Sequence, residues 1–217
     1  NTTVCGDTRY DRVMEIAKTA QFIPEIESFK GEGKLIVCGS TWPEDDKLII
    51  DYINNHEGKA KFIIAPHEIK EEKISAFIGA CTARVARYST MDINTLKDYD
   101  VLIVDTIGLL TKIYSYADVA YVGGAMGNTG LHNILEPATF GVPILIGPHF
   151  DKFPEAKILQ QLAGLYAVAS QDQLDERLNK LLSDDKFRAQ TGMIAGHFVN
   201  SNTGATRAVI DYIKDSN

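Results

Sequence analysis

The sequence predicts an α/β fold, a Rossmann-like, doubly wound parallel sheet of about six strands with helices on both faces. Short apolar runs such as "KLIVCG" and "VLIVDT" alternate with stretches of helical period. Runs that are apolar throughout are typical of parallel strands buried on both faces. Polar or glycine-rich segments follow several of these runs, and the carboxyl ends of parallel strands form the edge where such sheets bind ligands.

The individual elements follow from local signals. Two short helices on either side of Pro24 are expected before the first strand, and Pro43–Asn55 should be helical because a proline and three acidic residues open it. The expected strands are residues 34–39, 60–66, 83–89 (a weak candidate), 101–106, 119–124, 143–148 and 166–170. The other expected helices are residues 68–80, 108–117, 153–164, 171–183 and 206–215.

Composition narrows the classes of function. The 217 residues carry a net charge of −7 without a block of lysine or arginine, which argues against nucleic acid as the main partner. One phosphate-bearing small molecule remains compatible with this charge. Cys5, Cys38 and Cys81 are widely spaced without a CxxC or Cys/His metal pattern, so we expect a reducing compartment and no structural zinc. We also expect no other metal site and no cofactor.

The sequence shows no recognisable targeting signal. The sequence contains no apolar run of the ~18 residues that a membrane-spanning helix needs, and no signal peptide is visible. The first residues, "NTTVCGDTRYDRV", do not look like a natural start. We therefore expect the chain to be a domain excised from a longer parent protein.

The stretch "VGGAMGNTGLHNILEPATF" combines many glycines with polar side chains. A helix tolerates Pro137 in its first turn, so we expect the helix to begin near Asn133, with Asn133 as N-cap and Glu136 in the first turn. A capping box would explain this pattern by itself. Alternatively, loop N–H groups bind an anion while Glu136 accepts hydrogen bonds from ribose hydroxyls, which makes a nucleotide site. The binding residues would then be Gly127, Asn128, Thr129, Gly130, His132, Asn133 and Glu136.

Other strand ends carry further candidates. "GSTW" supplies Ser40 and Thr41, which could bind a phosphate or a sugar acid or could simply cap the next helix. "PHE" supplies Pro66 and His67, with an ordinary turn as the alternative. "DTIG" supplies Gly108, while its Asp105 and Thr106 would serve equally well as a helix cap. The glycine loop is no P-loop, and no G-x-G-x-x-G follows the first strand.

Several segments, in order, resemble a known family. "GDTRYDRV", "GSTW", "PHE", "VDTIGLL", "HNILEPA" and "GVPILIGP" are similar to landmarks in the C-terminal half of the bacterial 3-deoxy-D-manno-octulosonic acid (Kdo) transferases. The resemblance covers nearly the whole chain and implies one half of a GT-B glycosyltransferase, which has two Rossmann-like domains. Residues 1–217 would form a single C-terminal domain that binds CMP-Kdo, with residues 1–30 leading in from the interdomain linker.

The resemblance also implies roles for the candidate residues. "GSTW" and "GNTGLHN" would face the phosphate and Kdo, Glu136 would bind the ribose of CMP, and His67 would lie near the cytidine or phosphate. The parent would transfer Kdo with inversion to a lipid A precursor, at the cytoplasmic face of the inner membrane. Its catalytic carboxylate would lie in the missing domain, so this chain would contain no catalytic residue and would bind CMP without transferring Kdo.

Two departures from the family pattern stand out. The family often has "PRHPER" where this chain has "PHEIKEE", which leaves the charge partner of the phosphate unassigned. It also often has "GGHN", where this chain has Leu131 at the second glycine. Two alternatives stay open: the donor domain of another GT-B enzyme, such as a UDP-sugar transferase or epimerase, and a non-catalytic α/β binding module. Calorimetry with CMP and UDP, or a thermal shift with CMP, would separate them.

Overall fold

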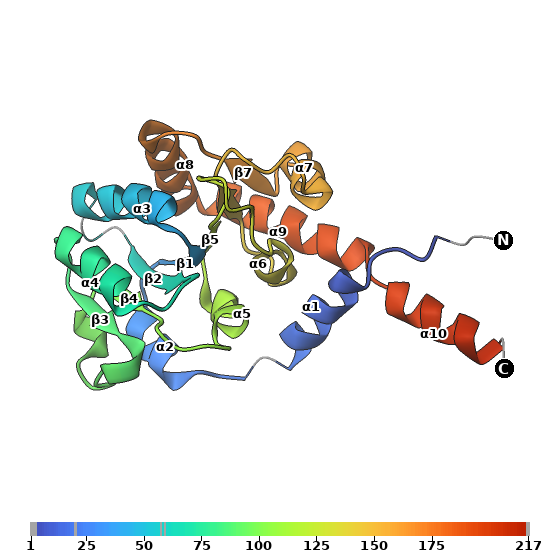
Figure 1. The fold of residues 1–217 in the computed structure, drawn as a ribbon, viewed down its shortest axis with the longest axis horizontal. Helices are drawn as coiled ribbons and strands as arrows, with labels where there is room; N and C mark the ends of the chain where they lie inside the picture. Colours follow the sequence, from blue (N-terminus) through green and yellow to red (C-terminus); the bar gives the residue numbers. More distant parts are fainter. Residues whose placement is uncertain (1–3, 20, 57, 59, 216–217) are drawn as a thin grey trace.

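The computed structural model describes residues 4–19, 21–56, 58 and 60–215. Its sheet has seven strands, all parallel, in the order β3-β4-β2-β1-β5-β6-β7 (Figure 1). The strands are β1 (Leu35–Thr41), β2 (Lys61–Pro66), β3 (Val85–Arg87), β4 (Val101–Ile103), β5 (Val119–Val122), β6 (Ile144–Ile146) and β7 (Leu165–Ala167). The predicted fold class is confirmed.

The prediction of about six strands is too low by one. The weak candidate in residues 83–89 does form a strand, β3, which pairs with β4 at the edge of the sheet. β3 buries Ala86 between two half-buried residues. Such a short edge strand lacks the continuous apolar run that marks the central strands, so the sequence pattern alone ranks it low.

The middle of the sheet is a topological switch point. β1 pairs with β2 on one side and with β5 on the other, and Gly39 lies opposite Val122 in the second pairing. β2, β3 and β4 lie on one side of β1, and the chain then crosses to the other side, where β5, β6 and β7 follow. Ligands of open α/β sheets bind in the crevice outside the strand ends at such a point. "GSTW", whose first three residues end β1, and the glycine-rich stretch after β5 therefore lie next to each other.

Helices cover both faces of the sheet (Figure 1). The helix predicted over Pro43–Asn55 is confirmed as α3, and the two helices around Pro24 are α1 and α2. The helices are α1 (Thr8–Lys18), α2 (Pro24–Lys30), α3 (Pro43–Asn55), α4 (Glu71–Ala80), α5 (Leu110–Ile113), α6 (Leu135–Thr139), α7 (Pro154–Gln161), α8 (Gln171–Ser183), α9 (Asp185–Ser201) and α10 (Ala205–Asp215).

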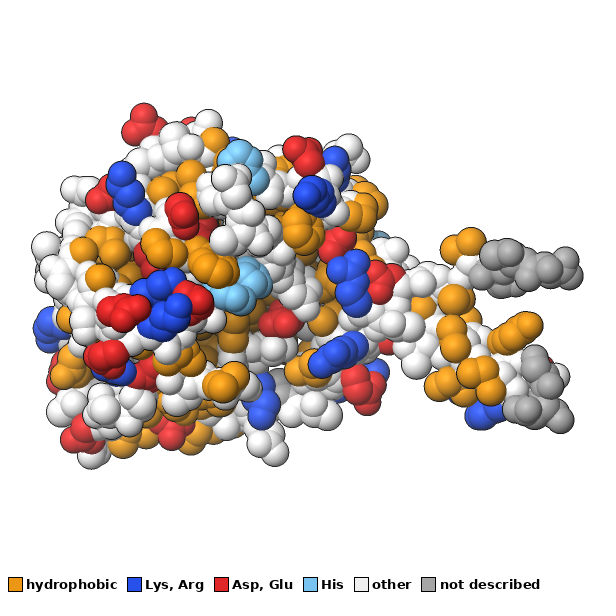
Figure 2. Space-filling model, viewed as in Figure 1, with side chains coloured by type: hydrophobic (Ala, Val, Ile, Leu, Met, Phe, Trp, Pro, Cys, Tyr) orange, Lys and Arg blue, Asp and Glu red, His pale blue; other side chains and the backbone are white. Residues whose placement is uncertain are grey.

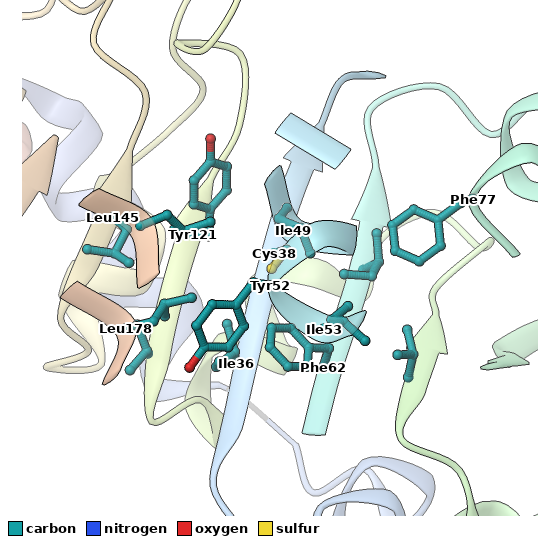
Figure 3. Close-up of a cluster of buried hydrophobic side chains, with 14 of the residues drawn as sticks. Ile36, Cys38, Ile49, Tyr52, Ile53, Phe62, Phe77, Tyr121, Leu145 and Leu178 are labelled. Atoms are coloured by element: carbon teal, nitrogen blue, oxygen red, sulfur yellow. The ribbon is translucent and has the colours of Figure 1, made fainter. Parts of the chain in front are cut away.

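Alternate residues of β1 face opposite sides of the sheet. Ile36 and Cys38 pack with α3, α4 and α8, and Figure 3 shows this cluster with Tyr52 of α3 beside Phe62 of β2. Leu35 and Val37 point to the other side, where α2 and the α5 region cover them. This period of two is that of a strand with both faces buried. Two-sided burial holds the strand ends, and hence the ligand edge, in place.

The long helix α9 was not predicted. It contains Gly192 and Gly196, which interrupt the apolar pattern and lower the intrinsic helix propensity. In the structure these glycines let α9 pack closely on the loop before β6: a Cβ at Gly192 would lie 2.0 Å from the carbonyl oxygen of Gly141. Backbone contact of this kind is a tertiary feature that helical period does not reveal.

The last helix, α10, extends away from the body of the molecule (Figure 1). Its exposed apolar side chains include Ile210, Tyr212 and Ile213, and Figure 2 shows hydrophobic side chains along this projecting part. Within the part of the chain that the structure describes, no helix combines the length and apolarity needed to cross a bilayer.

Candidate functional site

A buried carboxylate joins the two loops at the switch point. Asp45, in the first turn of α3, is fully buried. Its Oδ2 accepts hydrogen bonds from the backbone N–H groups of Trp42 and Gly124, each at 2.9 Å, and its Oδ1 accepts one from the Tyr121 hydroxyl at 2.8 Å. Burial raises the pKa of Asp45, while these donors favour the carboxylate. Asp45 therefore fixes the loop after β5 against the turn after β1.

Two glycines allow the loops to approach so closely. A Cβ at Gly123 would lie 2.5 Å from the carbonyl oxygen of Ser40. Gly124 has φ +94°, which disfavours other residues, and a Cβ there would lie 2.1 Å from the carbonyl oxygen of Gly130. Part of the glycine surplus thus serves backbone-to-backbone packing of the site.

The tip of the same loop borders a pocket of about 230 Å³. Gly127, Asn128 and Gly130 line one side, and the segment after β6 supplies His149 and Lys152. The Thr129 hydroxyl donates to the carbonyl oxygen of Gly124 at 3.1 Å, which helps to hold the loop. Asp151 and Phe153 also line the pocket, so it combines a glycine-rich backbone with one basic and one acidic side chain, a set of groups suited to a polar ligand such as a sugar.

Three aromatic rings from three separate loops meet beside this loop. The Trp42 indole N–H donates to Nε2 of His132 at 3.2 Å. The Trp42 ring stacks on the His67 ring with centroids 4.5 Å apart and an interplanar angle of 24°, and the two histidine rings are also 4.5 Å apart. Burial, and then the neighbouring His67, lower the pKa of His132. We call these residues the Trp42–His67–His132 cluster.

A lysine completes the surroundings of this cluster. The ammonium group of Lys73 on α4 lies 5.4 Å from the centroid of the Trp42 ring and forms an ion pair with Glu68. Figure 2 shows lysine or arginine and histidine side chains near one another on the viewed face. The Trp42–His67–His132 cluster and Lys73 thus present two imidazoles and a cation at the carboxyl edge of the sheet.

Glu136 is held from two sides. Its Oε2 accepts a hydrogen bond from the Thr111 hydroxyl at 2.8 Å, and its Oε1 accepts one from the side-chain amide of Asn133 at 3.1 Å. The predicted N-cap is wrong, because α6 begins at Leu135 with Ile134 at the N-cap, whereas the predicted position of Glu136 in the first turn is confirmed. Asn133 lies one residue earlier, where its Oδ1 accepts from the N–H of Leu135 at 3.1 Å, as asparagine does in local turns.

Comparison with known proteins places this geometry in context. No family model matches the chain. It is 30% identical over 164 residues to a 3-deoxy-D-manno-octulosonic acid transferase of Aquifex aeolicus, a match that covers 74% of this chain and 45% of the relative. The corresponding transferase of Chlamydia muridarum is 33% identical over 159 residues, with coverages of 71% and 36%. The chain is homologous to the Kdo transferases. It spans less than half the length of these two relatives.

A solved structure of a related domain has the same fold as this chain. The C-terminal CMP-Kdo binding domain of WaaA from Acinetobacter baumannii superposes with a TM-score of 0.67 at 19% identity. The match covers 87% of this chain and 98% of that domain. The chain therefore has the Rossmann-like α/β fold of a GT-B glycosyltransferase half, as predicted.

The remaining site residues predicted for this chain lie around the carboxyl edge of its sheet. Ser40 has φ +54°, a left-handed conformation that is uncommon outside glycine and that is often found at functional sites. Thr41 is buried and its carbonyl oxygen accepts from the N–H of His67 at 2.9 Å, which holds the turn after Pro66 against β1. Gly108 lies exposed in the turn after β4, three residues before Thr111.

Three contributors to the site were missed at the sequence level. Trp42 belongs to "GSTW" but had no predicted role, Asp45 looks like any acidic residue of a first helical turn, and Thr111 lies in an ordinary helical stretch. A proline followed two residues later by an acid is the one signal that could have singled out Asp45 as a capping group. Each of the three has a partner far away in the sequence, on β5, in the loop after it or on α6, so local patterns do not show these pairings.

Asp105 turns out to have a structural role. Its carboxylate accepts from Nε of Arg87 at 2.9 Å and from the Ser89 hydroxyl at 2.6 Å, which ties the end of β4 to the end of β3. The helix-cap alternative for Asp105 and Thr106 is wrong, because α5 begins at Leu110 with Leu109 at the N-cap and has no side-chain cap. Among the described residues, no group of three His, Cys, Asp or Glu side chains could hold a metal ion.

Replacing Asp46 with asparagine is expected to stabilise the protein at neutral pH. Asp46 Oδ1 is buried without a hydrogen-bond partner among the described residues, and burial raises the pKa of Asp46 to about 6. When the pKa of a carboxyl is higher in the folded protein than in the unfolded chain, the unfolded chain loses the proton first as the pH rises. The free energy of unfolding therefore falls between the two pKa values. Asp46→Asn should therefore increase the free energy of unfolding by about 1–3 kcal/mol above pH ~6 and by little below pH ~4. Urea unfolding across this range measures the effect, and a gain independent of pH would contradict it.

Proposed function

We propose that this chain is the donor-binding domain of an inverting glycosyltransferase that transfers Kdo from CMP-Kdo to a lipid A precursor in lipopolysaccharide biosynthesis. Homology to the Kdo transferases supports the proposal, as does the structural likeness to a domain described as CMP-Kdo binding. The observation that carries it is the arrangement at the switch point. The glycine-rich loop, the turn after β1 and Glu136 all lie at one edge, where nucleotides bind in such sheets.

Different residues of the site would bind different parts of the donor. The glycine-rich loop with its adjacent pocket, together with the turn after β1, would bind the phosphate and the acidic sugar. Glu136 would accept hydrogen bonds from the ribose hydroxyls, since a carboxylate beside a phosphate would be repelled. Thr111 and Asn133 hold Glu136 in one orientation, which lowers the entropic cost of binding.

The reaction would need a second domain. In an inverting transfer, a base removes a proton from the acceptor hydroxyl, whose oxygen attacks the anomeric carbon of Kdo. The bond from that carbon to the phosphate oxygen breaks, and CMP leaves with the electron pair. This chain's residues would bind and orient the donor and stabilise the departing CMP, while the base would come from the remainder of the parent. The isolated chain would then bind CMP without transferring Kdo.

The acceptor and the cellular location belong to the same proposal. A lipid A precursor would reach the donor from the other domain of a membrane-associated parent, at the cytoplasmic face of the bacterial inner membrane. The apolar side chains on α10 lie on the part of the molecule that extends furthest from the sheet, and thus away from the proposed donor site.

Replacing Glu136 with glutamine tests the ribose role. We expect the affinity for CMP to fall by about 10- to 100-fold, since a hydrogen bond to a charged group contributes about 1.5–3 kcal/mol. The free energy of unfolding should change by less than about 1 kcal/mol, because the glutamine oxygen still accepts from Thr111 and only the exposed hydrogen bond from Asn133 is lost. Calorimetric titration with CMP and urea unfolding measure the two effects.

The matched control is Glu72→Gln on the exposed side of α4, which should change neither quantity. If Glu136→Gln lowers stability and leaves the CMP affinity unchanged, the carboxylate serves only the start of α6. The nucleotide site would then have to lie elsewhere.

A further inference from the structure

We propose that a cavity between α3 and α4, with the groove that continues from it, binds a small primary amine through hydrogen bonds from its ammonium group to Thr41 and Asp46. The proposal goes beyond the proposed function and does not depend on it, since neither the glycine-rich loop nor His67 lines these spaces. The ligand has a charged head and a short aliphatic chain, as an alkylammonium ion does.

Two buried oxygen atoms of the cavity lack a hydrogen-bond partner. Thr41 is 2% exposed, and its hydroxyl has no partner among the residues that the structure describes. Oδ1 of Asp46 is buried and equally unpartnered within this part of the chain. Both residues line the cavity, whose volume of about 20 Å³ has room for one group the size of a water molecule. Because an unsatisfied buried acceptor is costly, the two oxygens indicate a place for a group that donates hydrogen bonds.

The cavity opens into a larger groove along the two helices. Ile64, Phe77 and Ile103 supply apolar walls to the cavity from the core cluster that Figure 3 shows. The groove has a volume of about 380 Å³ and shares Asp46 and Phe77 with the cavity. Its apolar lining consists of Pro43, Ile50, Ala76, Phe77 and Ala80. The methylene groups of a ligand can lie on this lining while its charged head reaches Asp46. An amine with an aliphatic chain therefore fits the two spaces better than a bare ion.

The surroundings of Asp46 favour a cationic ligand. Burial raises the pKa of Asp46 to about 6. The carboxylates of Asp45 and Glu44 act in the same direction, whereas the nearby Thr41 and Lys73 lower the pKa. At neutral pH Asp46 is therefore mainly a carboxylate, and an added ammonium group stabilises this state. A buried charge that is unfavourable in the free protein is a departure from ordinary packing of the kind found at functional sites.

The two lysines that line these spaces leave Asp46 available. The ammonium group of Lys73 forms an ion pair with Glu68. Lys47 is exposed on the groove, where Asp51, four residues further along α3, supplies the opposite charge. Among the residues that line the cavity and the groove, Asp46 is thus the carboxylate without a matching cation. The ligand's ammonium group supplies this cation.

The experiment is an NMR titration of the nitrogen-15-labelled chain with butylammonium chloride near pH ~7.5, in which sodium chloride is replaced so that the ionic strength stays constant. We expect saturable shifts of the amides around the cavity, with a dissociation constant of about 1 mM for so small a ligand. Asp46→Asn should bind at least about 10-fold more weakly, and Thr41→Val several-fold more weakly. Thr41 Oγ1 and Asp46 Oδ1 have no partner to lose, so both variants should fold.

The matched control is Glu72→Gln on the exposed side of α4, which lines neither space and should bind butylammonium as the wild type does.

Two further measurements need only the wild-type chain. Trimethylbutylammonium keeps the charge and the chain but has no N–H group, so it should bind at least about 10-fold more weakly. Between pH ~7 and ~5 the affinity for butylammonium should fall about 10-fold, because a carboxyl with a pKa of about 6 gains a proton in this range while the amine stays charged. Asp46→Asn should remove this dependence on pH.

Each negative result has a definite meaning. If butylammonium causes no saturable shift around the cavity, or binds Asp46→Asn as tightly as the wild type, the inference is wrong. Equal affinity for the trimethyl derivative would also overturn it, because the ligand would then donate no hydrogen bond to Thr41 or Asp46. None of these results bears on the proposed function, which the CMP titration tests separately.

Discussion

Replacing Asp45 with alanine is expected to lower the free energy of unfolding by about 3–5 kcal/mol and to abolish nucleotide binding. The substitution leaves the N–H groups of Trp42 and Gly124 and the hydroxyl of Tyr121 without their acceptor inside the protein. Each buried donor left unsatisfied costs about 1–3 kcal/mol. The binding defect follows because Asp45 joins the turn after β1 to the loop after β5.

Urea unfolding and CMP titration measure the two effects, with Asp51→Ala on the exposed side of α3 as the matched control. Asp45→Asn should be milder, since its amide oxygen can accept from the backbone while its NH₂ group donates to the Tyr121 oxygen. A loss below about 1 kcal/mol for Asp45→Ala would show that the loops are held together by other contacts.

Gly124→Ala is expected to destabilise the protein by about 2–4 kcal/mol and to prevent binding. The methyl group would lie 2.1 Å from the carbonyl oxygen of Gly130, and the backbone at φ +94° disfavours alanine. The loop must therefore shift, and the donor site with it. Thermal or urea unfolding and CMP titration provide the readouts.

Substitutions at two other glycines separate the effect of the steric clash from that of the backbone conformation. At Gly127 a Cβ would meet the side chain of Glu44 at 3.1 Å, which can move, so Gly127→Ala should have a small effect. Gly108 has φ +87° with nothing within 4 Å of a Cβ, so Gly108→Ala reports the backbone cost alone, about 1–2 kcal/mol. If Gly124→Ala costs no more than Gly108→Ala, the close approach of the loops is not what requires glycine.

Local chemistry predicts much of this fold. The bounds of α3 are as predicted because Pro43 and the acids after it mark a helix start, and the apolar runs locate the central strands. The helix α9 was missed because its glycines serve contact with Gly141. The start of α6 was misplaced because the Asn133 side chain caps from outside the helix. In both cases, tertiary or turn geometry overrides helical period.

In the candidate site, too, the sequence predicts the residue types at the strand ends but not which of them meet. The sequence places glycines, hydroxyls and histidines at strand ends, and the parallel sheet brings those ends together. The pairing of Trp42 with His132, and of Asp45 with Tyr121, depends on β1 lying beside β5. Strand order is a property of the whole sheet, so no local pattern could reveal which side chains meet. Which of the predicted residues contact a donor stays a prediction.

Calorimetric titration of this chain with CMP and with UDP under identical conditions tests the central claim, that the switch-point site is a donor site for a cytidine nucleotide. We expect CMP to bind at least about 10-fold more tightly than UDP, a difference of about 1.4 kcal/mol. CMP at 100 times its dissociation constant should raise the free energy of unfolding by about 2.7 kcal/mol. Tighter binding of UDP would indicate the donor domain of another GT-B enzyme, and binding of neither nucleotide would contradict the account.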